Sequence, residues 1–208
     1  MEQLYLILFS AGLFAGSFLK GYVCRRCKEK ILIQSPFLEL ANGISYVWVA
    51  SVLGGTWESL LACLCASVLL ALSLIDQRTC EIPLECNIFI GILGGIHLLL
   101  EFSDWLTYVA GMWVVSGMLL IAYYVTEKRG IGGGDIKLMA AAGLFLGWQK
   151  IILALFIGSS VGTVIHLTLM KLKGKGRVLA LGPYLAAGIF AAMLYGDKML
   201  AWYLKPSV

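Results

Sequence analysis

The sequence predicts an all-α, polytopic integral membrane protein with about eight transmembrane helices, and three observations favour this fold class. Apolar residues make up 60% of the 208 residues and charged residues only 13%, whereas a soluble domain has about 25% charged residues. The mean hydropathy is +0.89. The apolar residues also fall into runs close to the roughly 20 residues that cross a bilayer. We therefore expect a single membrane domain over residues 1–208.

Short polar or glycine-containing segments separate eight apolar runs. These runs are Leu4–Leu19, Phe37–Gly54, Trp57–Ile75, Cys86–Leu100, Trp105–Thr126, Ile136–Gly147, Ile151–Met170 and Pro183–Leu204. The sixth run is short and rich in glycine and alanine, so it is either a short span or a re-entrant segment buried in protein. Glu2 precedes the first run and basic residues follow it, which favours a retained span over a signal peptide.

The basic residues predict the orientation of the spans. Thirteen of the sixteen lysines and arginines fall on one side of an eight-span topology, most of them after the first and seventh runs. Basic loops stay in the cytoplasm, so we expect both termini outside. A seven-span topology would break this alternation. The net charge of +4 is thus explained by membrane topology, and we expect the lipid bilayer, not a nucleic acid, as the partner.

Two carboxylates stand at the ends of predicted spans on the cytoplasmic side. Asp76 follows the third run in "ALSLIDQRTCEIPLECN", and Asp135 precedes the sixth in "GIGGGDIKLM". An ionisable group near a span is costly, so each is a functional candidate. Two carboxylates in one water-lined cleft would share protons and could activate a water against a peptide carbonyl. The residues alone leave three alternatives: a proteolytic pair, helix-end residues, or a small proton- or cation-coupled transporter.

The glycines before Asp135 fit a site that receives a peptide. Gly132, Gly133 and Gly134 permit backbone angles that other residues avoid, and they let the chain lie close to an extended substrate. Pro83 is expected to break the helix beyond the third run. Elsewhere, glycines at i, i+4 spacing predict close helix packing, and the pairs are Gly12/Gly16 and Gly143/Gly147. His97 and His166 lie in apolar runs and are interpreted as packing or hydrogen-bonded residues.

Read together, four stretches resemble the type IV prepilin peptidase family. "LIDQRTCEIPLECN" resembles its first aspartate motif, and "GIGGGDIKLM" resembles its second, Gly-x-Gly-Asp-x-Lys. "LALGPYLAAG" is similar to the Gly-Pro-aromatic-Leu segment of its last span, and "AGSFLKGYVCRRCKEKILIQSPFLELANG" to its N-terminal region. These stretches follow the family's order over nearly the whole chain.

The resemblance implies an aspartyl endopeptidase of the bacterial inner membrane. Such an enzyme cleaves the basic leader of a prepilin or pseudopilin substrate at the cytoplasmic face. Asp76 and Asp135 match the catalytic aspartates, and Lys137 matches the family's lysine. Glu39 matches an acidic residue of the N-terminal region and is a candidate for substrate contact or methylation. An inactive scaffold for pilus assembly is a further alternative.

The cysteine motif departs from the family's usual pattern. Residues 20–36 are predicted to form a short basic cytoplasmic loop that carries Cys24 and Cys27. Many members also methylate the new N-terminus with S-adenosylmethionine, and these have a longer loop with two Cys-x-x-Cys pairs. Four thiolates make a closed zinc site, so zinc here would need ligands from a second subunit or elsewhere. Methylation and the oligomeric state stay open, while proteolysis by two aspartates requires no cofactor.

Overall fold

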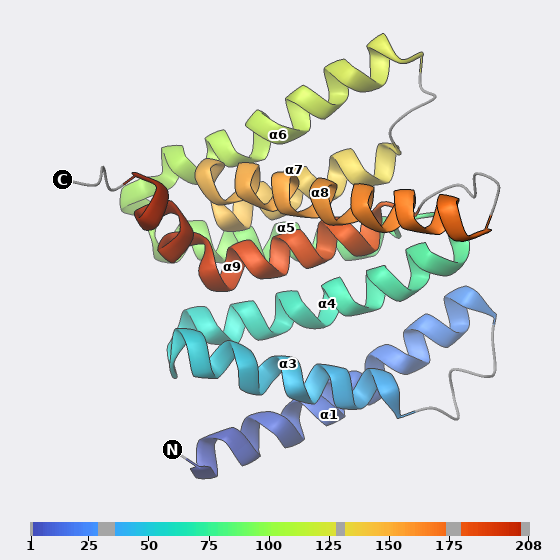
Figure 1. Ribbon diagram of the computed structural model, residues 1–208. Coiled ribbons are helices and arrows are strands. Elements are labelled where there is room, and N and C mark those ends of the chain that lie inside the picture. The colour runs from blue at the N-terminus through green and yellow to red at the C-terminus, as the bar shows by residue number, and fades with distance from the viewer. Residues whose placement is uncertain (1, 29–35, 128–131, 174–179, 205–208) are drawn as a thin grey trace.

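The computed structural model describes residues 2–28, 36–127, 132–173 and 180–204, and within these ranges all regular secondary structure is helical (Figure 1). Eight α-helices and one short 3-10 helix are present in the described residues. They are α1 (Glu2–Cys27), α3 (Phe37–Leu53), α4 (Trp57–Thr79), α5 (Leu84–Leu100), η1 (Phe102–Asp104), α6 (Trp105–Val125), α7 (Gly133–Leu146), α8 (Trp148–Lys173) and α9 (Gly182–Leu204). Each predicted apolar run corresponds to one α-helix.

The length and surface of the helices confirm a polytopic membrane protein. Four described segments are long and apolar enough to span a bilayer, and they are Gln3–Cys27, Trp57–Thr79, Phe102–Val125 and Trp148–Lys171. The helices α3 and α5 are shorter apolar helices of 17 residues each. Large apolar side chains are exposed on the bundle surface, among them Phe14 at 82% and Phe156 at 72%. Such a surface is stable in lipid and not in water.

The helix α4 lies at the centre of the bundle and contacts α1, α3, α5 and α9 (Figure 1). Both chain termini lie at one end, which we call the terminal end. The C-terminal ends of α1, α4 and α8 and the N-terminal ends of α7 and α9 meet at the other end, which we call the basic end. This arrangement agrees with an even number of crossings and with termini on a common side, as the basic residues predicted.

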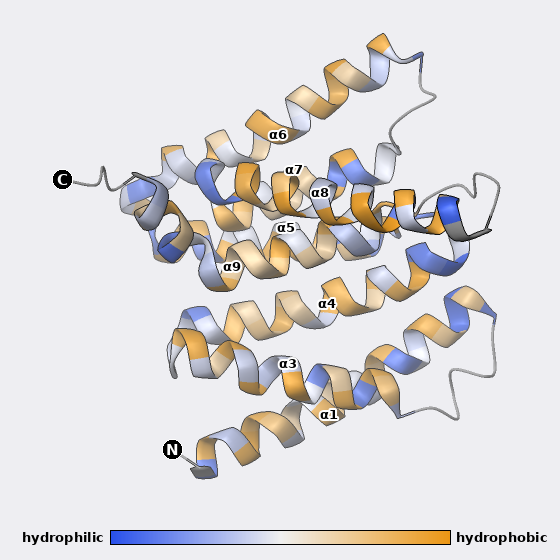
Figure 2. Cartoon of the chain, viewed as in Figure 1, coloured by the Kyte–Doolittle hydropathy of each residue, from blue (hydrophilic) through white to orange (hydrophobic). Residues whose placement is uncertain are grey.

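Charge and hydropathy follow the same division (Figure 2). Hydrophilic residues gather at the two ends of the bundle, while the middle of most helices is apolar. Arg25 and Arg26 lie in the last turn of α1, and Arg78 lies in the last turn of α4. At the terminal end, Lys150 lies in the first turn of α8 and pairs with Asp197 of α9. The basic end therefore carries the arginine-rich helix ends.

The predicted loop over residues 20–36 is wrong in its first part, because α1 continues to Cys27. Val23 is fully buried, and it belongs to a small core with Leu38 of α3 and Ala71 and Ile75 of α4. Burying these apolar side chains stabilises two further helical turns beyond the first apolar run. The helix thus carries both cysteines of the motif, and residues 29–35 lie outside the described part of the chain.

The helix α7 is short but enclosed by protein. Its 14 residues rise about 21 Å at 1.5 Å per residue, less than the roughly 30 Å of a bilayer core. Leu138, Met139 and Ala142 are fully buried, and α7 packs against α5, α6, α8 and α9. Gly147, with a φ of +82°, ends the helix and turns the chain directly into α8.

Glycines allow the helices to approach closely, as their spacing predicted. A β-carbon at Gly12 would lie 2.7 Å from the Cα of Gly43 in α3, and one at Gly16 would lie 2.7 Å from the Cα of Glu39. Gly143 of α7 packs directly on Gly111 of α6, where a β-carbon would contact backbone. Backbone cannot move aside as a flexible side chain can, so these contacts require glycine.

We expect Gly111→Ala to destabilise the bundle by about 1–3 kcal/mol, the usual cost of overpacking a tight contact. The added methyl would lie 2.7 Å from the carbonyl carbon of Gly147 and would push α6 away from α7. Thermal unfolding of the purified protein in detergent measures this loss. Gly117→Ala is the matched control on the same helix, because nothing lies within 4 Å of its position. Equal melting temperatures for both variants would contradict the packing argument.

Candidate active site

Asp76 lies in the last turn of α4 and is buried, with 4% of its surface exposed. The helix ends just beyond it, because Cys80 adopts a left-handed conformation (φ +54°) and its N–H donates to the Asp76 carbonyl oxygen at 2.8 Å. Pro83 then stands before the first residue of α5 with an extended backbone. The prediction that this proline would separate two helices is confirmed. The Asp76 side chain lines a cavity together with Cys80, Glu81 and Ile82 of the α4–α5 connection.

Asp135 lies in the first turn of α7, and it is also buried, at 8% exposed. Gly132 precedes the helix in an extended conformation, and its carbonyl oxygen accepts the Asp135 N–H at 3.1 Å. The carboxylate therefore lies at the N-terminal end of a helix, where unpaired backbone N–H groups stabilise negative charge.

The glycines before Asp135 allow neighbouring atoms to lie close to the backbone, and they do not adopt unusual backbone angles. Among the described glycines, only Gly54 and Gly147 have a positive φ, so the expectation of special angles at Gly132–Gly134 is wrong. A β-carbon at Gly134 would lie 3.0 Å from the Cβ of Ile82, and one at Gly132 would lie 2.8 Å from Asp135 Oδ2. Gly134 thus lets α7 start against the α4–α5 connection, and Gly132 leaves room for the Asp135 carboxylate.

The two aspartates line one cavity of about 290 Å³ at the basic end of the bundle. We call it the aspartate cavity. Its lining residues are Asp76, Cys80, Glu81, Ile82, Gly132, Gly133, Gly134 and Asp135. Glu81, Gly132 and Gly133 are exposed, so the cavity is accessible from outside. The structure thereby brings together two carboxylates that lie on separate helices and 59 positions apart in the sequence.

Gly182 completes this site, although the sequence alone indicates no role for it. It is the first residue of α9, and its N–H donates to Asp76 Oδ2 at 2.9 Å. A β-carbon at this position would lie 2.6 Å from the same oxygen, so only glycine permits the approach. The sequence signal was Gly182-Pro183 at the start of an apolar run, a pattern typical of a helix N-terminus. Nothing in that pattern indicates which side chain the N–H binds.

The remaining predicted site residues lie outside the aspartate cavity. Lys137 is exposed on α7 and does not line the cavity. Glu39 accepts from Lys20 Nζ at 3.2 and 3.3 Å, between α3 and α1. Cys24 and Cys27 are both partly exposed near the end of α1. The described residues contain no cluster of three or more His, Cys, Asp or Glu side chains that could hold a metal ion.

Comparison with known proteins identifies a family and several curated relatives. The sequence model of the Type IV leader peptidase family matches residues 63–167, a segment that includes both Asp76 and Asp135. A protein of Aeromonas salmonicida named prepilin leader peptidase/N-methyltransferase is 34% identical over 196 residues, which is 90% of this chain and 66% of the relative.

Relatives with the same name occur in other organisms. The protein of Pseudomonas aeruginosa is 31% identical over 89% of this chain and 66% of its own length. That of Neisseria gonorrhoeae is 33% identical over 89% of this chain and 67% of its own length. The chain thus spans about two thirds of the length of the curated relatives that it matches. No solved structure matches the chain significantly.

We expect Gly182→Ala to lower the rate of peptide cleavage, the activity that the sequence resemblance implies, by roughly tenfold to a hundredfold. The estimate follows from the loss of one hydrogen bond to a charged group, about 1.5–3 kcal/mol, since the methyl displaces the Asp76 carboxylate. Initial rates on a pilin-like peptide measure the effect. The matched control is Gly95→Ala, because nothing lies within 4 Å of that helical position. A Gly182→Ala variant as fast as the control would show that the hydrogen bond does not position Asp76.

Proposed function

The chain belongs to the type IV leader peptidase family, and we propose that it is an aspartyl endopeptidase that removes the basic leader of prepilin-like or pseudopilin substrates. One observation carries this proposal. Asp76 of α4 and Asp135 of α7, both buried, line the same accessible cavity. Burying a carboxylate in a membrane protein costs free energy, so two buried carboxylates in one cavity indicate a functional site. The family's relatives named as prepilin leader peptidases supply the substrate class.

The proposed chemistry uses the two carboxylates in different protonation states. Like charges held close together do not both ionise easily, so the pair shares a proton. The ionised carboxylate takes a proton from a water, which attacks the carbonyl carbon of the scissile peptide bond. The protonated carboxylate donates to the carbonyl oxygen, and the tetrahedral intermediate then collapses with a proton passed to the leaving amine. No cofactor takes part in these steps.

The backbone around the cavity supports this chemistry. The Gly182 N–H orients one oxygen of Asp76 and leaves the other for water or substrate. The exposed Gly132 and Gly133 present backbone without side chains at the cavity edge, where an extended peptide can lie close. We propose that Lys137, exposed on α7, holds the start of this helix at the membrane surface.

We propose that cleavage occurs on the cytoplasmic side of the bacterial inner membrane. The support is the clustering of arginines at the same end of the bundle as the aspartate cavity, because basic loops stay in the cytoplasm. In this orientation both termini are outside. A substrate would place its apolar helix in the bilayer and its basic leader at the cytoplasmic surface.

A second proposal concerns methylation of the cleaved substrate and the roles of Cys24, Cys27 and Glu39. The relatives are also named as N-methyltransferases, and methylation of the new N-terminus would require S-adenosylmethionine. Two thiolates do not complete a tetrahedral zinc site. We therefore propose that Cys24 and Cys27 stay reduced thiols and do not hold zinc in a single chain. We also propose that Glu39, paired with Lys20, holds α1 against α3.

Asp76→Asn and Asp135→Asn should each lower the cleavage rate by about 10³-fold or more, because an amide neither accepts the proton from water nor donates one to the carbonyl. Purified variants in liposomes with a pilin-like substrate measure the rate. Asp104→Asn, an exposed aspartate at the terminal end, is the control and should retain full activity. Normal cleavage by either active-site variant would remove the aspartate pair from the mechanism. Ion flux without cleavage would favour a transporter.

Mass spectrometry of the processed substrate should show loss of the basic leader whenever the wild-type chain is present. Adding S-adenosylmethionine tests methylation in the same sample, since an N-methylated product is heavier by one methylene group. The Asp76→Asn variant supplies the control without cleavage. An intact substrate in the presence of wild-type chain would contradict the proposed activity.

A further inference from the structure

An apolar groove of about 660 Å³ lies between α3 and α9, with α4 as its floor, and Figure 1 shows α4 between these two helices. We call it the α3–α9 groove. None of the described side chains that line it is charged. The hydroxyls of Ser45 and Ser73 donate to the carbonyl oxygens of Asn42 and Leu69 within their own helices. The groove therefore presents an apolar surface to a ligand.

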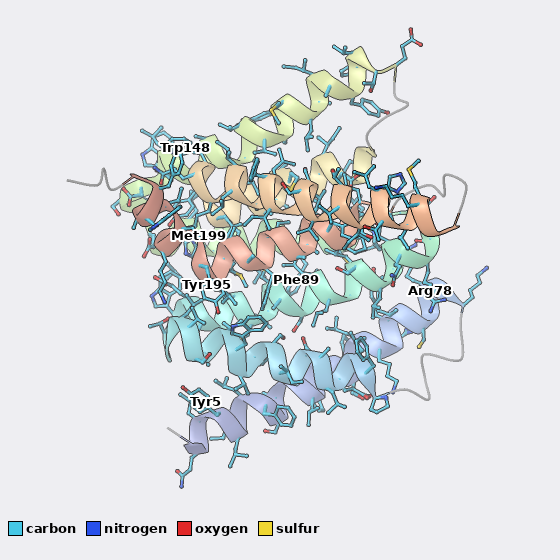
Figure 3. The ribbon with its side chains drawn as sticks, in the orientation of Figure 1. Tyr5, Arg78, Phe89, Trp148, Tyr195 and Met199 are labelled. Atoms are coloured by element: carbon cyan, nitrogen blue, oxygen red, sulfur yellow. The ribbon has the colours of Figure 1, made fainter. Side chains whose placement is uncertain are left out.

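The α3–α9 groove is closed toward the terminal end of the bundle. Trp48 of α3 and Phe190 of α9 both line it, and their rings pack edge to face with centroids 5.7 Å apart. The Trp48 indole N–H also donates to the Tyr195 hydroxyl at 2.8 Å. Tyr195 lies at the opposite end of the bundle from Arg78 (Figure 3). A ligand in the groove therefore lies between this closed end and the basic end.

At the basic end, the groove reaches the hydrogen bond between Asp76 and Gly182. Pro183 lines the groove and directly follows Gly182, whose N–H donates to Asp76 Oδ2 at 2.9 Å. Ser73 lines the groove on α4, and its position precedes Asp76 by about 4.5 Å along the helix axis. An extended peptide covers this distance with one or two residues, at about 3.3 Å each. A peptide held at Asp76 can therefore continue into the groove.

The surfaces on the two sides of this hydrogen bond differ in charge. The aspartate cavity is lined by the carboxylates of Asp76, Glu81 and Asp135, and by no basic side chain among the described residues. The α3–α9 groove, by contrast, is apolar. Carboxylates attract a basic segment, and an apolar groove in the membrane accepts an apolar helix. The order of the two surfaces thus matches a chain in which a basic segment precedes an apolar helix.

A second apolar cavity, of about 430 Å³, lies on another face of α4, between α1 and α5. An ion pair between Arg26 of α1 and Glu85 of α5, at 2.6 Å, bridges its basic end. On α4 its lining extends only to Ala71, about 7.5 Å along the helix axis from Asp76. The position of Asp76 therefore favours the α3–α9 groove as the place where an apolar helix continues from the site.

We infer that the α3–α9 groove binds the first two turns of the apolar helix that follows the leader in the substrate. The inference rests on the proposed function, from which it takes the substrate. From Pro183 to Phe190, the α9 wall of the groove rises about 10 Å, which is two helical turns. A substrate helix bound here presents the peptide bond that precedes it to Asp76 and Asp135.

The walls of the groove favour a helix over a lipid chain. Small side chains occur on both walls, at Ala41 of α3 and at Ala186 and Ala187 of α9. Small residues let two helices approach closely, whereas a flexible acyl chain adapts equally well to large side chains. The occupant with the best fit is therefore the substrate's helix.

Photocrosslinking from the substrate tests the inference directly. A pilin-like substrate carries benzoylphenylalanine in the first two turns of its apolar helix, and the full chain with Asp135→Asn holds it uncleaved in liposomes. We expect crosslinks at Ile44 of α3 and Ala187 of α9, which are exposed in the groove, with tandem mass spectrometry as the readout. Crosslinks confined to Phe14 and Phe89 of the second apolar cavity, or to lipid, would overturn the inference.

Filling the groove should weaken the selection of the full substrate. The measured quantity is kcat/KM for the full substrate divided by kcat/KM for a soluble peptide that lacks the apolar helix. Ala187→Phe should lower this ratio roughly tenfold, the factor that overpacking by one large side chain produces. Ala201→Phe, exposed on α9 outside the groove, is the control and should keep the wild-type ratio. A wild-type ratio in Ala187→Phe, with an unchanged melting temperature, would contradict binding in the groove.

The two experiments separate this inference from the proposed function. Cleavage by wild type together with crosslinks outside the α3–α9 groove would overturn the inference and leave the proposed function standing. Crosslinks within the groove without any cleavage by wild type would support binding of the helix and overturn the proposed cleavage.

Discussion

Hydrocarbon offers no hydrogen-bond partners, and this constraint decides where the polar chemistry of the molecule lies. Asp76 lies in the last turn of α4 and Asp135 in the first turn of α7, so neither carboxylate is held at the middle of a span. Helix ends carry backbone groups without intrahelical partners, and the N–H of Gly182 at the start of α9 binds Asp76. A second polar cavity, lined by His97, Glu101 and Gln149 among others, follows the same rule at the terminal end, where α5 ends and α8 begins.

Helix ends can meet at one cavity only if the helices themselves lie close together. Glycine provides this proximity at several interfaces. Gly111 meets Gly143 between α6 and α7, and Gly12 and Gly16 lie against α3. The position of Asp135 therefore depends on the contact at Gly143, about two helical turns away on the same helix. A substitution at Gly143 would act on the aspartate cavity without touching it.

The sequence predicted most of the fold, because bilayer thickness makes the length of an apolar run informative. Pro83 also indicated the break after Asp76, since proline cannot continue a helix interior. The extension of α1 through Val23 was missed, because its stability comes from burial against Ala71 and Ile75 of another helix. A run of arginines and cysteines carries no local sign of that contact.

The two aspartates of the candidate site were predictable from the sequence, but the roles of the glycines around them were not. Asp76 and Asp135 stand out in an apolar chain because ionisable groups near spans are rare. Gly132 and Gly134 were identified, but the reason is contact with Asp135 and Ile82, which only the packed structure reveals. Gly182 had no assigned role, because a hydrogen bond between groups 106 residues apart leaves no local pattern.

That same separation has a consequence for biosynthesis. Chains emerge from the ribosome N-terminal end first, so α4 enters the membrane well before α9, whose first residue supplies the N–H that binds Asp76. Until the last helix is inserted, the Asp76 carboxylate lacks this partner. A nascent chain that stalls before residue 182 therefore holds both aspartates in an incomplete site. The Asp76 carboxylate therefore gains this hydrogen bond only when α9 has packed against α4.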